Sequence, residues 1–166
     1  MENLLNNEPV KRVKNFITKF DPNLEILILN TTARTAKDAS EALKCDVGAI
    51  IKSLLLKVDN DFLICLVAGD KRCSIQKIKN FLNKKNVSMA SAVEVKANTG
   101  FSIGGVSPVA HIKKLNIFID SSLSRFTDIF AAAGHPNCVF KIKYNLLIKI
   151  TKALEIELTE WEKAKH

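Results

Sequence analysis

Three of the six glycines of this chain lie within six residues, in the segment 99–108 (TGFSIGGVSP). Adjacent glycines reach backbone conformations that other residues avoid, and they let the main chain approach a ligand closely. Pro108 fixes its own φ and restricts Ser107, so we expect this segment to be rigid. Rigid backbone with accessible N–H groups suits a developing oxyanion or a phosphate. A tight turn that binds no ligand accounts for the same glycines equally well.

Lys52 interrupts an apolar stretch. If residues 50–56 form a strand, Lys52 shares one face with Ile50, Leu54 and Leu56. A charge on an apolar face is costly unless it has a partner or a chemical purpose. The alternative is structural, because the long stem of a lysine can carry its ammonium group to water.

Two further polar residues occupy positions suited to chemistry. His135 lies between Gly134 and Pro136 in a predicted tight turn, where it can donate a hydrogen bond, bind a substrate or only pack its ring. Asp120 ends a predicted strand, where it can orient a substrate amine or cap the next helix. The serines at 121, 122 and 124 favour the cap.

Several common catalytic patterns are absent from the sequence. It contains no HExxH or CxxC pair, no phosphate-binding P-loop and no GxSxG motif. Its four cysteines show no paired spacing, and none lies where a thiolate would be stabilised. We therefore expect no metal and no other cofactor, and any catalysis to proceed without a covalent intermediate.

The net charge of +8 is concentrated in one segment. Residues 71–85 contain six basic residues and no acidic one: Lys71, Arg72, Lys77, Lys79, Lys84 and Lys85. A second basic stretch includes Lys141, Lys143, Lys149 and Lys152. Clustered positive charge indicates a polyanion partner, above all nucleic acid. A drifting base composition is the alternative, since Lys, Ile and Asn are abundant and Arg is scarce.

The elements that must position these residues mix helices and strands without strict alternation, which favours one α+β domain over residues 1–166. Periodicity predicts helices at 8–20, 35–44, 74–83, 91–98 and 146–154, with capping boxes expected at Thr35 with Asp38 and at Ser91 with Glu94. Strands are expected at 24–29, 47–58, 62–69, 115–119, 130–133 and 139–142, the second and third forming a hairpin. No run of residues is apolar enough to cross a membrane, and no leader is evident, so we expect a cytoplasmic protein without disulfides.

Four separated features occur together in the order seen in one family: Lys52 after Gly48-Ala-Ile-Ile, the segment 99–108, Asp120, and Ala133-Gly134-His135-Pro136. Over about residues 24–155 the chain resembles the YbaK/EbsC family, free-standing relatives of the editing domain inserted in bacterial prolyl-tRNA synthetase. The resemblance implies a mixed, twisted, barrel-like sheet surrounded by helices. It also implies hydrolysis of mischarged aminoacyl-tRNA in trans, with prolyl-tRNA synthetase as a second candidate partner.

The resemblance also implies roles for individual residues. Lys52 matches the essential lysine, expected near the terminal adenosine phosphate or the ester. Gly104 and Gly105 begin the GGVSP loop, whose backbone is expected to hold the reacting ester. The remaining substrate-binding residues implied are Thr31, Thr32, Thr99, Gly100, Val106, Ser107, Pro108, Asp120, Gly134 and His135. The basic residues of 71–85 would hold the tRNA body.

The turn Ala133-Gly134-His135-Pro136-Asn137 differs from the Gly-Gly-Lys-Arg turn associated with deacylases specific for cysteinyl-tRNA of the proline type. This difference favours a small side chain such as alanine, serine or 2-aminobutyrate over cysteine, without saying which. The expected function is therefore an aminoacyl-tRNA deacylase. The alternative is a non-catalytic regulator that binds aminoacyl-tRNA or an amino acid in the same pocket.

Overall fold

The computed structural model describes residues 3–30 and 35–162. Five α-helices lie in these residues: α1 (Glu8–Phe20), α2 (Ala36–Leu43), α3 (Ile75–Leu82), α4 (Ala92–Thr99) and α5 (Tyr144–Thr151). Three short 3₁₀ helices, η1 to η3, span Leu4–Asn6, Val47–Ala49 and Ser121–Arg125. None of the helices in the described residues is long and apolar enough to cross a membrane.

The strands form three sheets within the described residues. A five-stranded sheet has the order β5-β2-β3-β6-β9, with β5 at Val87–Met89, β2 at Ile51–Val58, β3 at Asp61–Ala68, β6 at Asn116–Asp120 and β9 at Leu154–Ile156. A three-stranded sheet has the order β1-β8-β7, with β1 at Ile26–Ile28, β8 at Cys138–Lys143 and β7 at Asp128–His135. A two-stranded sheet pairs β10 (Thr159–Trp161) with β4 (Lys71–Cys73).

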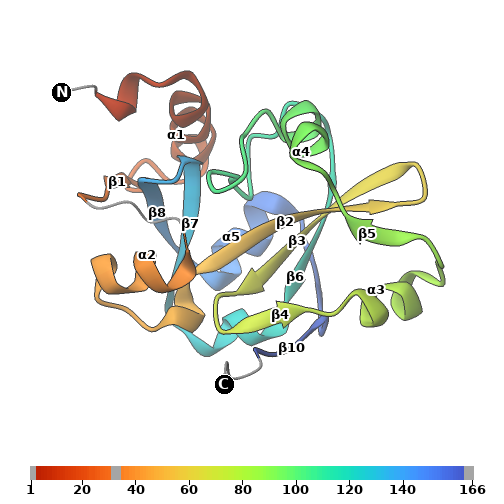
Figure 1. The fold of residues 1–166 in the computed structure, drawn as a ribbon. Coiled ribbons are helices and arrows are strands. Elements are labelled where there is room, and N and C mark those ends of the chain that lie inside the picture. Colours follow the sequence, from red (N-terminus) through yellow and green to blue (C-terminus); the bar gives the residue numbers. More distant parts are fainter. Residues whose placement is uncertain (1–2, 31–34, 163–166) are drawn as a thin grey trace.

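The strand pairing confirms the mixed α+β class. Strands β2 and β3 form the predicted antiparallel hairpin, whereas β6 lies parallel to β3 and β9 parallel to β6. The sheets twist around a shared core but do not close into a barrel in the part of the chain described (Figure 1).

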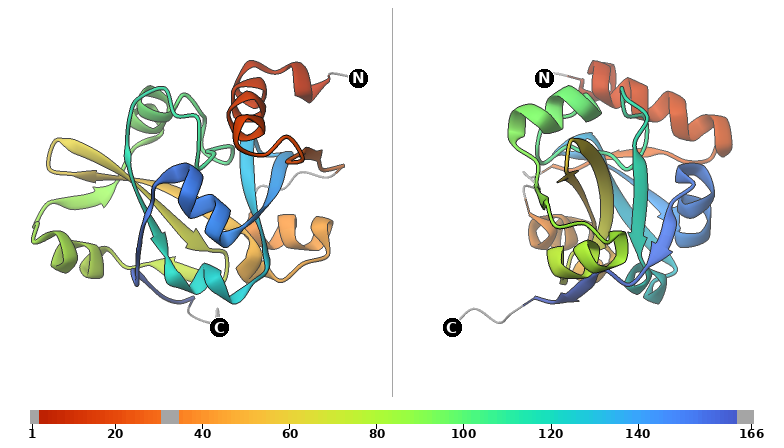
Figure 2. Two further views of the ribbon diagram at one scale, coloured as in Figure 1. Left: turned by 180° about the vertical axis from the view of Figure 1, so that it is seen from behind. Right: turned by 90° about the vertical axis from the view of Figure 1, so that its right-hand side faces the viewer.

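The main core lies between the two larger sheets and under α1 and α5. Val13 of α1, Ile64 of β3, Phe140 of β8 and Leu147 of α5 are all fully buried there. Helix α1 lies at one end of the molecule and strand β10 at the other, as the views of Figure 2 also show. The core thus joins the sheet that carries Lys52 to the sheet that carries the turn around His135.

Three predicted caps are confirmed. Ser91 and Glu94 form a reciprocal capping box at the start of α4, and the Thr35 hydroxyl accepts a hydrogen bond from the Asp38 N–H at the start of α2. Asp120 caps η3, where its carboxylate accepts a 3.1 Å hydrogen bond from the Ser122 N–H.

The C-terminal part departs from the sequence-based prediction. The last helix ends at Thr151 instead of Leu154, because Lys152 adopts a left-handed conformation (φ 55°) that terminates it. The charged tail, for which no strand was expected, contributes β9 and β10. These strands are three residues long, so their partners on β6 and β4 define them more than their own sequence does.

Candidate functional site

A cavity of about 900 Å³ lies along the free edge of β2. Strand β2 pairs with β5 only from Leu56 to Val58, and Ile50, the residue before β2, forms an isolated bridge with Phe130 of β7. Between these two contacts the edge of β2 faces the cavity instead of another strand. Apolar side chains form most of its wall: Val47, Ile50, Leu54, Leu55, Val95, Val106, Phe130 and Val139. A largely apolar cavity of this size is typical of a site for a small organic group.

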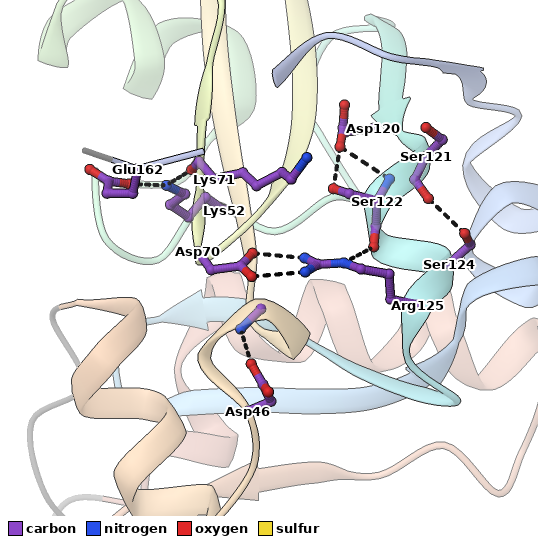
Figure 3. A network of polar contacts seen from close by, with 11 residues as sticks. Asp46, Lys52, Asp70, Lys71, Asp120, Ser121, Ser122, Ser124, Arg125 and Glu162 are labelled. Atoms are coloured by element: carbon purple, nitrogen blue, oxygen red, sulfur yellow. Dashed lines mark hydrogen bonds and ion pairs between the residues drawn. The ribbon is translucent and has the colours of Figure 1, made fainter. Parts of the chain in front are cut away.

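Lys52 provides a cation at one end of this cavity. Its Nζ donates a 2.5 Å hydrogen bond to the Lys71 carbonyl oxygen and lies 3.7 Å from the Glu162 carboxylate (Figure 3). It lies opposite Val67 in the hairpin, as the predicted apolar face requires. The Lys52 side chain remains 30% exposed, with its ammonium group between the Lys71 carbonyl and the Glu162 carboxylate.

Asp70 forms the wall beside Lys52. Its carboxylate receives two hydrogen bonds from Arg125, at 2.8 and 2.9 Å, which lower the pKa of Asp70. Because this bidentate pair joins the turn after β3 to η3, it fixes the backbone from which β4 and the Lys71 carbonyl extend.

The glycine segment follows α4 and contributes Ile103, Gly104 and Val106 to the cavity wall. Gly104 has a φ of +94°, which a residue with a side chain rarely adopts. The Gly105 N–H donates a hydrogen bond to the Ser102 carbonyl at 3.0 Å, whereas no partner for the Gly104 N–H is found among the described residues. Of the two glycines, Gly104 alone lines the cavity and has a backbone N–H without a partner in the part of the chain described.

The end of β7, where the structure places Gly134 and His135 instead of in the expected turn, packs directly against this segment. A Cβ on Gly105 would lie 2.9 Å from the backbone nitrogen of His135, so only glycine fits there without displacing backbone. A β-bulge between Ala132 and His135 bends this end of β7, and Pro136 beyond it lines the cavity. The two segments that the sequence marked separately thus form one continuous wall.

Arg12 of α1 holds the glycine segment from the side away from the cavity. Its guanidinium donates hydrogen bonds to the carbonyls of Ala110 (2.8 Å) and Thr99 (3.3 Å) and lies 4.6 Å from the centre of the Phe101 ring. His111 also braces this segment through a 2.7 Å hydrogen bond between its Nε2 and the Ser107 carbonyl. Since a carbonyl oxygen only accepts, Nε2 carries the donated proton, and burial lowers the pKa of His111.

Not all of the predicted site residues line the cavity. Lys52, Gly104 and Val106 do, whereas Gly105 and Gly134 lie behind the wall. The following residues build the segments around the cavity instead of lining it: Thr99, Gly100, Ser107, Pro108, Asp120 and His135. Thr31 and Thr32 lie outside the described residues.

Four of these surrounding residues have side chains that form hydrogen bonds within the chain. Thr99 is buried, and its hydroxyl donates to the Val95 carbonyl at 2.7 Å. The Ser107 hydroxyl accepts from the Val109 N–H, and His135 Nδ1 accepts from the Asn137 N–H at 3.0 Å. Asp120 is buried and accepts a 2.8 Å hydrogen bond from the Leu158 N–H. These residues shape the site by holding its loops and strands.

Ser53 was missed by the analysis of the sequence. It lines the cavity next to Lys52, and its hydroxyl oxygen is buried without a hydrogen-bond partner among the described residues. A buried polar atom left in this state costs free energy, which a bound donor would recover. The small residues Ala131 and Ala132 face the same cavity from β7, and a run of alanines inside a strand was the one sequence signal for such space.

Most of the basic residues of 71–85 are engaged with other parts of the chain. Arg72 pairs with Glu160 (2.6 Å), Lys77 with Glu157 (3.4 Å) and Lys84 with Asp59 (3.4 Å). Lys71 lies 4.2 Å from the centre of the Trp161 ring. Lys79 and Lys85 have no side-chain partner among residues 3–30 and 35–162. In the same residues, no group of three His, Cys, Asp or Glu side chains is arranged to hold a metal ion.

The fold and cavity define an α+β domain with a lysine and a glycine-rich loop around an apolar pocket. Comparison with known proteins identifies the family. Residues 31–150 match the family described as the aminoacyl-tRNA editing domain, and because this is most of the chain, the chain belongs to that family. This confirms the resemblance inferred from the sequence.

Three relatives illustrate the range of the family. The chain is 29% identical over 134 residues to the uncharacterized protein YwhH of Bacillus subtilis, a match that covers 80% of this chain and 85% of that protein. It is 29% identical over 104 residues to the proline–tRNA ligase of Macrococcus caseolyticus, covering 63% of this chain but 18% of the ligase. A crystal structure described as a candidate trans-editing enzyme for prolyl tRNA synthetase is similar with a TM-score of 0.86, at 31% identity, covering 92% of this chain and 97% of that one.

Proposed function

We propose that this protein hydrolyses the ester bond of mischarged aminoacyl-tRNA in trans, releasing free amino acid and tRNA. The observation that carries the proposal is the single cavity that joins Lys52, the glycine segment and the turn after β7. The substrate we propose is tRNA of the proline type carrying a small amino acid, such as alanine, serine, cysteine or 2-aminobutyrate.

In this proposal the apolar part of the cavity receives the amino acid and the end near Lys52 receives the tRNA terminus. The ammonium group of Lys52 neutralises either the terminal phosphate or the developing negative charge on the ester carbonyl. Both roles place a positive charge where the substrate or transition state is negative. The alanines of β7 and the aliphatic side chains of β2 limit the size of the amino acid that fits.

The reaction requires that water attack the carbonyl carbon while the bond to the ribose oxygen breaks and that oxygen takes up a proton. The Gly104 N–H is the backbone donor we assign to the oxyanion, since the Gly105 N–H is bonded to Ser102. A donor of this kind contributes about 10²–10³ in rate. The neighbouring ribose hydroxyl of the substrate is the group we assign to activate the water.

Exclusion of the correct amino acid follows from size. One methylene group in a pocket changes binding by about 1–3 kcal/mol, so a second and smaller site is an effective way to correct errors of a synthetase. Prolyl-tRNA is therefore expected to be spared, because its ring is bulkier and more rigid than the side chains proposed as substrates.

The test is deacylation of alanyl-, seryl-, cysteinyl- and prolyl-tRNA of the proline type by wild type, Lys52→Ala and Lys57→Ala. Lys57 is the matched control, because it lies on the same strand but pairs with Glu94 outside the cavity. We expect release of one or more small amino acids, sparing of proline, and a loss of at least 100-fold in Lys52→Ala only. Tight, salt-sensitive tRNA binding without release from any substrate would instead favour the non-catalytic regulator.

A further inference from the structure

The segment 157–162, here called the C-terminal strap, runs along β4 and ends beside Lys52. Residues 154–162 contain four glutamates and no basic residue. Each glutamate of the strap meets a different basic side chain: Glu157 meets Lys77 at 3.4 Å, Glu160 meets Arg72 at 2.6 Å and Glu162 meets Lys52 at 3.7 Å. The strap thus places carboxylates on the cations that a polyanion would use.

These contacts coincide with the surface that the proposed function needs. Lys52 is the cation of the cavity, and Arg72 and Lys77 belong to the basic segment assigned to tRNA. Carboxylates and phosphates pair with lysine and arginine through the same charge-assisted hydrogen bonds. A substrate phosphate and the Glu162 carboxylate therefore compete for one position, which Figure 3 shows next to Lys52.

We propose that the C-terminal strap is an internal competitor of the tRNA acceptor end, which must displace residues 159–162 to reach Lys52. This inference rests on the proposed function, since it assigns a regulation to the same site. It makes the strap a filter that weak or non-cognate polyanions do not displace.

The strap is built to detach at a defined point. Leu158 is fully buried, its N–H is bonded to the Asp120 carboxylate and its carbonyl accepts a 2.8 Å hydrogen bond from the Ser74 N–H. Beyond Leu158 the strap is held by the three-residue strand β10, in which Thr159 is buried and its carbonyl accepts a 2.7 Å hydrogen bond from Lys77. The Glu162 N–H also donates to the Asp70 carbonyl (3.3 Å), Trp161 packs against Lys71 and Arg125, and the carboxylates of Glu160 and Glu162 are at least half exposed. Each exposed ion pair contributes little to stability. The phosphodiester backbone of tRNA can therefore replace the glutamates as the partner of these cations while Leu158 stays in place.

A different role for Glu162 would be to orient Lys52 for catalysis. The Lys71 carbonyl already holds the Lys52 ammonium group at 2.5 Å, so the orientation does not depend on Glu162. The two roles separate in kinetics. Loss of a competitor lowers KM and the Kd for tRNA, whereas loss of a positioning group lowers kcat.

The first test is the double variant Glu160→Gln/Glu162→Gln beside the control Glu25→Gln. Glu25 is exposed and precedes β1 in a different sheet, so the control removes a negative charge without touching the strap. At low salt we expect the double variant to lower KM for aminoacyl-tRNA and Kd for uncharged tRNA by about two- to fivefold per pair removed, with kcat unchanged. A fall in kcat, or no change in either KM or Kd, overturns the inference.

The second test uses Trp161, the only tryptophan of the chain, which lies in the strap over Lys71 and Arg125. Addition of uncharged tRNA to the wild-type protein is expected to increase acrylamide quenching of Trp161 as the strap leaves. Binding with unchanged or decreased quenching overturns the inference and leaves the proposed function intact. Failure of both wild type and the double variant to bind tRNA overturns the proposed function itself, and the inference with it.

Discussion

Gly105 and His135 meet backbone to backbone. The position of a Cβ on Gly105 lies 2.9 Å from the nitrogen of His135 and 3.0 Å from the carbonyl carbon of Gly134. The contact joins two segments that are about thirty residues apart in the chain and belong to different elements. At this contact the glycine segment packs directly against the end of β7.

Gly105→Ala is expected to push these segments apart, because the atoms that its Cβ would meet are backbone and cannot rotate away. Overpacking of this kind destabilises by about 1–3 kcal/mol. We expect a lower melting temperature together with a loss of deacylation. Gly104→Ala is the informative comparison, since its Cβ has space (Pro136 Cγ at 3.5 Å) but its φ is strained. Unchanged activity in Gly105→Ala would show that the close contact is dispensable.

Ser53→Ala is expected to separate stability from activity. Its hydroxyl is buried without a partner among the described residues, so removing it should leave the melting temperature unchanged or raise it. If the hydroxyl accepts a hydrogen bond from the substrate ammonium group, kcat/KM falls by about 10- to 100-fold, from about 1.5–3 kcal/mol for a bond to a charged group. Ser88→Ala, at an exposed serine of β5, is the control. A loss of stability with full activity would refute this role.

The unfolding free energy is expected to fall as the pH drops below about 6.5, in part because of His111. Burial lowers the pKa of His111 in the folded state, so near and below this pH the unfolded chain binds more protons than the folded one. The contribution of His111 to the unfolding free energy is therefore fully present above the pKa that His111 has in the unfolded chain, and it is lost as the pH falls. Denaturant titrations from pH 5 to 8 should show a smaller slope in His111→Gln. An identical slope in the variant would exclude His111 as a source.

Lys79→Ala and Lys85→Ala are expected to weaken tRNA binding and reduce its salt dependence. Neither side chain has a partner among the described residues, so each is available to a phosphate. For every phosphate that is no longer neutralised, the slope of log K against log salt should fall by about 0.7–0.9. Lys14→Ala on α1 controls for net charge, since Lys14 is exposed at the opposite end of the molecule. If both variants show the same salt dependence of tRNA binding as wild type, these lysines do not contact tRNA. A drifting base composition would then be the better explanation for their abundance.

The sequence predicted the parts of the site that have local causes. The capping box of Ser91 and Glu94 marks the start of α4 with residues three apart, and alternation along β2 places Lys52 on a defined face. The sequence also favoured Asp120 as a helix cap, and Asp120 caps η3 in the structure. The four motifs of one family, found in the correct order, then predicted that distant segments share one site. Local periodicity cannot predict contacts between segments so far apart in the chain.

The rest depends on contacts between residues far apart in the chain. Strands β4 and β10 are three residues each and pair across more than eighty residues, so neither has a pattern that predicts it alone. The Glu162–Lys52 ion pair follows from that pairing and could not be predicted without it. In the sequence, Ser53 looks like an ordinary strand residue. It lines the cavity because β5 pairs with β2 only from Leu56 to Val58 and leaves the edge beside Ser53 open.

Helix α1 ends before the first residue of the family match, yet it contacts both segments of the site. Pro9 lies against Gly134, and Arg12 holds the carbonyls of Thr99 and Ala110. Among the described residues, a protein trimmed to 31–150 would keep the side chains that line the cavity apart from Glu162, but it would lose the contacts of α1 with both segments. We therefore expect a fragment that lacks α1 to lose order at both segments, so fusion designs based on this fold should include the first helix.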